Sequence, residues 1–183
     1  VYEVDPIRDG NSFTTRRVLA KQNKKTIFIM SASFNKKMTG INHQIPMPNL
    51  AQPEGLKSTL DQISEIEKSN PKMHHRLKSV LPRAFDIRPV EAFLAKYSKN
   101  SKPFDNMWFT TSDKLNQSDI AMHHQLLAYA SDYNLLSTAT LPHVEELQNK
   151  SMFYASLDHA LWFHRDFRID DWLLYAMDSP SAS

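Results

Sequence analysis

The fold is decided by LAYASDYNLL, residues 127–136, together with SLDHALWFHR, residues 156–165. The first stretch continues a run from Ile120 whose apolar residues cover most of a helix circumference, which is typical of a buried helix. We expect Ser118 to cap this helix and Asp132 to be the carboxylate that it carries. The second stretch alternates between two mostly apolar faces, which predicts a covered strand. Any chemistry is expected where the helix and the strand meet.

Other patterns typical of strands lie on both sides of this helix. Residues 85–91 and 107–111 precede it, and residues 172–178 follow it. Pro89 favours an edge strand, because proline has no backbone N–H to donate within a sheet. A helix placed between sheet segments indicates an antiparallel sheet wrapped over a helix, which is an α+β fold.

The first part of the chain, residues 1–36, predicts further strands with a polar turn at residues 22–25. Within 26–34 the side chains alternate, so that one face carries only apolar residues: Phe28, Met30, Ala32 and Phe34. We expect this apolar face to cover a core.

Residues 37–82 change character and predict a linker, with a surface amphipathic helix within 54–69 that ends before Pro71. The neighbouring His74 and His75 suggest a metal site at first. Adjacent side chains on a helix or strand diverge, however, so a solvated pair is expected.

Composition excludes several classes of protein. The 183 residues include 22 basic and 20 acidic ones, a net charge of +2, which gives no basic stripe for nucleic acid and no polybasic membrane patch. The absence of cysteine excludes disulfides, thiolate metal sites and a cysteine nucleophile, and it fits a reducing compartment such as the cytoplasm. No apolar run approaches the length of a membrane span.

Five motifs, in order and at matching spacing, resemble the type II acyl-CoA thioesterases (TesB-like enzymes). They are IRDGNSFTTRRV at 7–18, MSASF at 30–34, LAYASD at 127–132, SLDHALWFHR at 156–165 and WLLY at 172–175. That family consists of two tandem hot-dog folds, each a curved antiparallel sheet around a long helix. The resemblance implies closing strands of a first hot dog in 1–36, a linker with an amphipathic helix in 37–82, and a second hot dog in 83–183. It also implies a fragment that lacks the N-terminal part and the final strands.

The reaction implied by the resemblance is hydrolysis of fatty acyl-CoA to free fatty acid and CoA, without a metal or an organic cofactor. In the family an Asp, a Ser or Thr and a Gln position the attacking water. Asp132 matches the first position and Ser156 the second, whereas the Gln position falls beyond Ser183. We expect the Asp132 carboxylate and the Ser156 hydroxyl within reach of one bridging water. From spacing alone, Asp132 is better explained as a solvent-facing carboxylate at a helix end, and only the family motif favours a catalytic role.

Two alternatives stay open. A hot-dog hydratase or dehydratase of acyl thioesters would need His123 or His124 as its base, and both lie about two helical turns before Asp132. A catalytically silent fragment that binds acyl-CoA is the other. Asp158 and His159 are expected to be structural, because neighbours on a strand point to opposite faces. Acyl-CoA is the expected partner, with neither nucleic acid nor membrane, and self-association is expected by analogy with hot-dog proteins.

Overall fold

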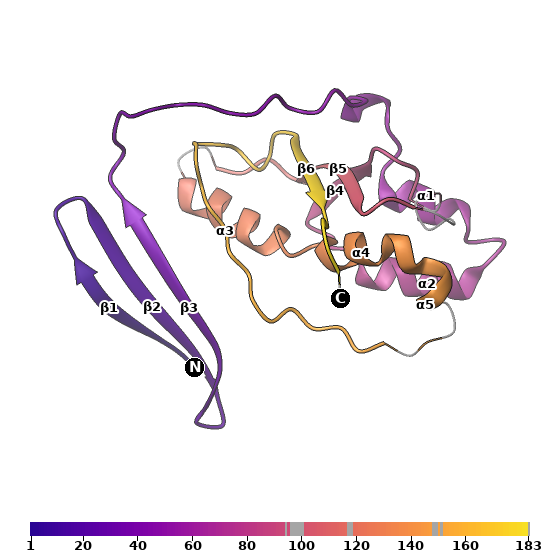
Figure 1. Ribbon diagram of the computed structural model, residues 1–183. Coiled ribbons are helices and arrows are strands. Elements are labelled where there is room, and N and C mark those ends of the chain that lie inside the picture. Colours follow the sequence, from indigo (N-terminus) through magenta and orange to yellow (C-terminus); the bar gives the residue numbers. More distant parts are fainter. Residues whose placement is uncertain (94, 96–100, 117–118, 148–149, 151, 183) are drawn as a thin grey trace. The chain divides into compact units, whose positions relative to one another are not determined.

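The computed structural model describes residues 1–93, 95, 101–116, 119–147, 150 and 152–182. The chain divides into two compact units, Val1–Met47 and Pro48–Ser183. Figure 1 shows the strands β1–β3 in the first unit and all the helices in the second. The helices of residues 37–82 therefore group with the second unit, while the division into hot-dog domains stays a prediction.

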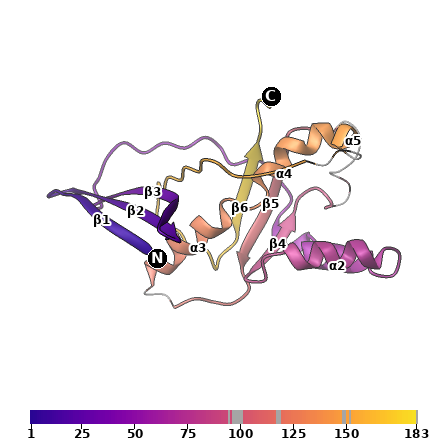
Figure 2. The same cartoon turned by 90° about the horizontal axis from the view of Figure 1, so that it is seen from below.

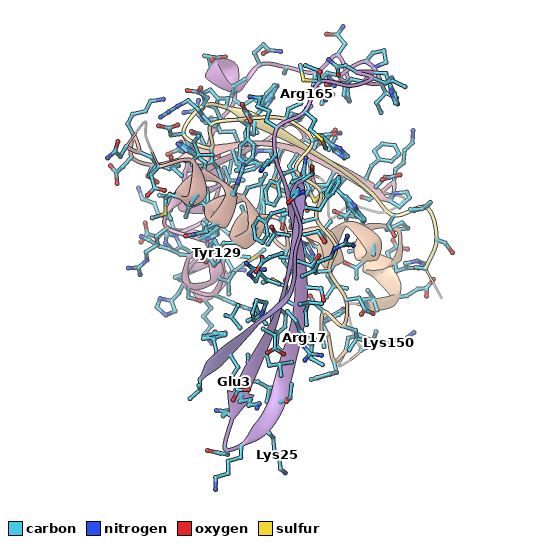
Figure 3. The ribbon with its side chains drawn as sticks, turned by 90° about the vertical axis from the view of Figure 1, so that its left-hand side faces the viewer. Glu3, Arg17, Lys25, Tyr129, Lys150 and Arg165 are labelled. Atoms are coloured by element: carbon cyan, nitrogen blue, oxygen red, sulfur yellow. The ribbon has the colours of Figure 1, made fainter. Side chains whose placement is uncertain are left out.

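The first unit is an antiparallel sheet in the order β1-β2-β3, formed by β1 (Tyr2–Asp9), β2 (Phe13–Gln22) and β3 (Lys25–Asn35). The turn between β2 and β3 holds Asn23 and Lys24 at φ values of 49° and 63°. Positive φ at both central residues is the geometry of a tight hairpin turn, and asparagine tolerates it well. Figure 3 shows Lys25 at the tip of this hairpin, with Glu3 and Arg17 farther along the sheet.

The apolar face of β3 is exposed rather than covered. Phe28 keeps 53% of its surface accessible, Met30 42% and Phe34 58%. The prediction that this face covers a core is therefore wrong for the described chain. The alternating pattern predicted the strand correctly, but such a pattern carries no information about what packs against the apolar face.

The second unit contains a second antiparallel sheet, of β4 (Phe85–Pro89), β5 (Phe104–Thr111) and β6 (Leu173–Asp178). Figure 2 shows the three strands side by side with β5 in the middle. All three strands were predicted, and Pro89 does lie on an edge strand. The sheet exists because each strand places apolar side chains on a shared face, where Ile87 pairs with Phe109 and Met107 with Tyr175.

The segment before this sheet folds into a 3-10 turn (Pro53–Gly55) and two helices, α1 (Thr59–Glu65) and α2 (Pro71–Val80). Helix α1 was predicted, and α2 was missed. Pro71 ends the first helical pattern, but it also begins the next helix, since proline suits the first helical position. The expected solvated histidine pair is wrong for His74, which is 6% exposed, and right for His75.

Helix α3 (Ile120–Ala130) packs one face on the second sheet. Leu126, Leu127 and Ala130 contact the core cluster that includes Phe85 and Phe109. The expectation of a helix buried on all sides is wrong, because Ile120 is 62% and Tyr129 66% exposed. Figure 3 shows Tyr129 on this helix.

The ends of α3 differ from the sequence-based picture. Ser118, the predicted cap, lies outside the described residues. Instead, the Asp119 side chain accepts a hydrogen bond from the Met122 amide at 2.9 Å. The predicted helical run to Leu136 is interrupted, because Asn134 adopts the left-handed conformation at φ 68°. Short helices follow at Leu135–Thr140 (α4), Leu141–His143 (η3) and Val144–Leu147 (α5).

The covered strand predicted over residues 156–165 is absent: these residues form no helix or strand. The segment instead passes α3 as an irregular chain (Figure 1), with the Phe163 ring 4.6 Å from that of His124. A strand requires a neighbouring strand for its backbone hydrogen bonds, and none among the described residues pairs with this segment.

Candidate active site around Asp132

Asp132 lies in the tight turn between α3 and α4. The Ser131 amide donates to the Leu127 carbonyl at 2.8 Å, and the Tyr133 amide donates to the Ala130 carbonyl at 3.0 Å. These bonds close the last turn of α3. The carboxylate of Asp132 therefore projects just beyond the helix end, and 58% of its side chain is exposed.

Asn134 anchors this turn to the sheet. Its side-chain amide donates to the carboxylate of Asp105, which lies on β5 and is 1% exposed. Its left-handed backbone directs the chain from α3 into α4. The position of Asp132 is thereby fixed from both sides, by the helix before it and by the strand contact after it.

Ser156 meets Asp132 as the resemblance implies, although it comes from an irregular segment and not from a strand. The Ser156 hydroxyl donates to the Asp132 carboxylate, at 3.2 Å to Oδ1 and 3.4 Å to Oδ2. The two side chains are thus in direct contact, closer than the expected water bridge. The expected solvent-facing position at a helix end also describes Asp132, and the contact with Ser156 gives this exposed carboxylate a partner.

His159 also belongs to this cluster, while its expected structural role stays a prediction. Its Nε2 lies 2.8 Å from Ser131 Oγ, and its Nδ1 lies 3.9 Å from Asp132 Oδ1. The expectation relied on strand alternation, which placed His159 on the face opposite Ser156. Without a strand that alternation does not apply, and the spacing Ser156-x-x-His159 was the signal available in the sequence.

Tyr175 supports the same turn from β6, and sequence reasoning did not single it out. Its hydroxyl donates to the Ser131 carbonyl at 2.5 Å. Burial, and secondarily the negative charge of Asp132, raise the pKa of Tyr175 to about 12. The phenol therefore stays neutral, and a donor, at physiological pH.

A cavity of about 450 Å³ opens next to Asp132. Most of its lining side chains are apolar, although polar atoms supply nearly half of its surface, and the lining comes from the end of α2, from β4, β5 and β6, and from the last turn of α3. The lining includes Val80, Leu81, Phe85, Ile87, Met107, Phe109, Tyr129 and Tyr175. An apolar cavity bordered by a few polar groups is the usual form of a small-molecule site.

The histidines of α3 lie apart from this cluster. His123 is 2% exposed, and its Nδ1 accepts a hydrogen bond from the Ile169 amide at 3.2 Å. The ring of His124 packs against those of Phe163 and Phe167. Neither histidine lines the cavity, so the geometry does not favour a hydratase base on this helix.

The described residues contain neither a cluster suited to a metal ion nor a helix suited to a membrane. Within them, no three or more His, Asp or Glu side chains gather in a way that could hold a metal ion. Among the same residues, no helix has the length and apolar character needed to cross a membrane.

Two solved structures resemble this one over its whole length. An acyl-CoA thioesterase II, TesB2, of Mycobacterium marinum superposes with a TM-score of 0.75 at 38% identity, covering 62% of that chain. The tesB protein of Mycobacterium avium subspecies paratuberculosis gives a TM-score of 0.70 at 25% identity, covering 59%. A hot-dog protein of Alicyclobacillus acidocaldarius, 13% identical with a TM-score of 0.51, shows the fold alone. The expected α+β hot-dog class is confirmed.

Curated relatives match all of this chain. Acyl-coenzyme A thioesterase 8 of Homo sapiens is 35% identical over 189 residues, and acyl-CoA thioesterase 2 of Haemophilus influenzae is 33% identical over 190 residues. The chain spans 58% of the human protein and 63% of the bacterial one. A family model described as acyl-CoA thioesterase matches residues 83–183, more than half of the sequence. The chain therefore belongs to the acyl-CoA thioesterase family.

Proposed function

We propose that this protein hydrolyses fatty acyl-CoA to free fatty acid and CoA, with a water oriented by Asp132 and Ser156. The observation that carries the proposal is the contact between the Ser156 hydroxyl and the Asp132 carboxylate, at 3.2 Å and 3.4 Å, beside an apolar cavity. The names of the relatives support the reaction class. Self-association and a cytoplasmic location remain predictions.

Asp132 acts as the base in this mechanism. Its half-exposed carboxylate accepts the proton of a water that attacks the thioester carbonyl carbon. Ser156 uses its only proton to hold the carboxylate, and its oxygen lone pairs remain free to accept a hydrogen bond from the same water. Ser156 is therefore a positioning group rather than the nucleophile. The resemblance places a third group, a Gln, beyond Ser183, and we assign that role to no residue of this chain.

The apolar cavity accommodates the acyl chain. Each methylene group transferred from water to such a wall gains about 0.8 kcal/mol. Phe85, Met107 and Phe109 supply part of that wall, and Asp132 also lines the cavity. In our proposal the thioester carbonyl lies near the base while the hydrocarbon lies against the sheet.

The test compares three variants of the full-length protein by release of free CoA thiol from a fatty acyl-CoA. Asp132→Asn removes the base. The expected fall in turnover is at least tenfold, because general acid–base catalysis typically contributes roughly 10²–10⁴-fold to the rate. Ser156→Ala should lower turnover by less, because it removes only a hydrogen bond that positions the water. Asp158→Asn is the matched control, since this exposed carboxylate of the same segment should leave turnover unchanged.

Unchanged turnover in Asp132→Asn contradicts the proposal. A larger loss in Ser156→Ala than in Asp132→Asn would instead indicate a serine nucleophile. Binding of acyl-CoA without any turnover by the wild-type protein would favour the silent binding protein. Circular dichroism of each variant separates loss of catalysis from loss of structure.

A further inference from the structure

His159 contacts two consecutive residues of the turn that carries the proposed base. We infer that His159 is a positioning residue that tethers this turn through Ser131 and takes over the proton collected by Asp132. Its Nε2 is 2.8 Å from Ser131 Oγ, and its Nδ1 is 3.9 Å from Asp132 Oδ1. The inference rests on the function proposed above, which assigns no role to this ring.

The hydrogen bonds of Ser131 fix the orientation of the ring. Ser131 Oγ donates its only proton to the Ala128 carbonyl at 2.9 Å. The hydroxyl oxygen can then only accept at its contact with His159, so the Nε2–H must be the donor. With Nε2 protonated, a neutral ring presents the bare Nδ1 to Asp132. This is the tautomer needed to receive a proton from the carboxylate.

The geometry allows the transfer with a small movement. The distance of 3.9 Å between Nδ1 and Oδ1 exceeds a direct hydrogen bond by about 1 Å. The Asp132 side chain is 58% exposed, so its carboxylate has room to turn from Ser156 toward His159. The His159 side chain is 35% exposed, which leaves the ring a route to release the proton to solvent.

The proton balance of the step is simple. An O–H bond of water breaks as its oxygen bonds to the thioester carbonyl carbon, and the proton moves to Asp132 and then to His159 Nδ1. The C–S bond breaks in the second half of the reaction, and CoA leaves as the thiolate. The imidazolium returns its proton to solvent, from which the thiolate takes one. No oxidant, reductant or metal is required.

Ionisable groups face this cluster from other elements as well. Asp132 faces Nδ1 from the end of α3. From β6, the Tyr175 hydroxyl donates to the Ser131 carbonyl, and burial together with Asp132 raises the pKa of Tyr175 to about 12. Tyr175 therefore stays neutral throughout the range where imidazole titrates, and it cannot produce a change in rate near neutral pH.

The experiment measures kcat and KM for fatty acyl-CoA against pH in the full-length protein. His159→Gln keeps an amide donor near the Nε2 position but cannot accept a proton. The expected result is a fall in kcat of about tenfold with KM unchanged, together with loss of the acid limb, the fall in kcat on the acid side of the pH profile that a proton acceptor at His159 would give the wild type. His159→Asn also lacks the imidazole ring, and it replaces His159→Gln in the same measurement if that variant folds poorly. His164→Gln, an exposed histidine of the same segment, is the control and should match the wild type.

The outcomes separate this inference from the proposed function. If Asp132→Asn loses turnover while His159→Gln keeps the wild-type kcat and acid limb, the role of His159 is overturned and the proposed function stands. If Asp132→Asn keeps turnover, both are overturned, because the relay then has no donor. A purely structural role for His159 would lower the melting temperature of both histidine variants without altering the pH profile.

Discussion

Replacing Tyr175 with phenylalanine removes one hydroxyl from beneath the turn that carries Asp132. The ring itself stays, and with it the edge-on contact to Phe109 at 6.2 Å between centroids. The lost group is the donor to the Ser131 carbonyl at 2.5 Å. A hydrogen bond of this kind contributes about 0.5–1.5 kcal/mol net to folding. The variant should therefore unfold about 1 kcal/mol more easily than the wild type.

The pKa of Tyr175 determines how the contribution of this side chain to stability depends on pH. Burial first, and Asp132 second, raise this pKa from 10.0 to about 12, so the folded state favours the neutral phenol. At about 1.36 kcal/mol per pH unit the full effect would be near 2.7 kcal/mol. The side chain is only partly buried, and screening by solvent reduces this pH-dependent effect to about 1 kcal/mol.

The sign of the pH dependence follows from the raised pKa. The unfolded chain ionises first, so the contribution of Tyr175 is complete below pH 10.0 and disappears as the pH rises to about 12. Urea unfolding of wild type and Tyr175→Phe should therefore differ by about 1 kcal/mol near neutral pH and converge at the alkaline end. Other groups that ionise there affect both proteins equally.

Tyr129→Phe is the matched control for this measurement. Tyr129 is 66% exposed, and its ring stacks on Phe85, a contact that survives the loss of the hydroxyl. This variant should unfold like the wild type at every pH. A Tyr175→Phe protein as stable as the wild type near neutral pH, or a difference that stays constant up to pH 12, would refute the reasoning.

Two further predictions concern the elements around the site. Asn134→Ala should destabilise the protein by about 1–2 kcal/mol in urea unfolding, because alanine resists the left-handed backbone at φ 68° and cannot bond Asp105. Glycine tolerates that backbone conformation, so Asn134→Gly should lower the free energy of unfolding by less. Equal destabilisation by the two variants would contradict the strain argument. Asp170→Asn should lower the melting temperature at neutral pH, since the Arg168 side chain and the Leu115 amide lower the pKa of Asp170 from 3.8 to about 2. The stabilisation by the ionised Asp170 is present above pH 3.8 and disappears as the pH falls to about 2. The melting temperatures of the wild type and the variant should therefore converge there.

The elements that sequence predicted well are those whose signals are local. The strand at 85–89 alternates in burial, those at 104–111 and 173–178 contain short apolar runs, and Pro89 marked an edge through its missing N–H. Helix α2 was missed because Pro71 was taken only as the end of the preceding pattern. A proline at such a junction is compatible with both an end and a beginning, and the Asn70 cap was the signal that decides between them.

The failures arise where structure depends on distant partners. The apolar face of β3 and the segment 156–165 both have strand alternation, yet one is uncovered and the other unpaired in the described chain. Alternation reports which side chains share a face, whereas pairing and covering depend on other parts of the fold. The proximity of Asp132 and Ser156 was predicted through motif resemblance, whereas the proximity of His159 was not predicted because a strand was assumed.

The location of Asp132 itself suggests that it serves more than stability. A carboxylate just beyond the C-terminal end of α3 faces the negative end of the helix dipole, where it costs about 0.3–1 kcal/mol. A chain optimised for stability would place a cation there. Here the charge is held instead by the Ser156 hydroxyl, with His159 beside it and the turn secured by Tyr175 and Asn134. A charge that several side chains maintain beside this cavity supports the general-base role that we propose for Asp132.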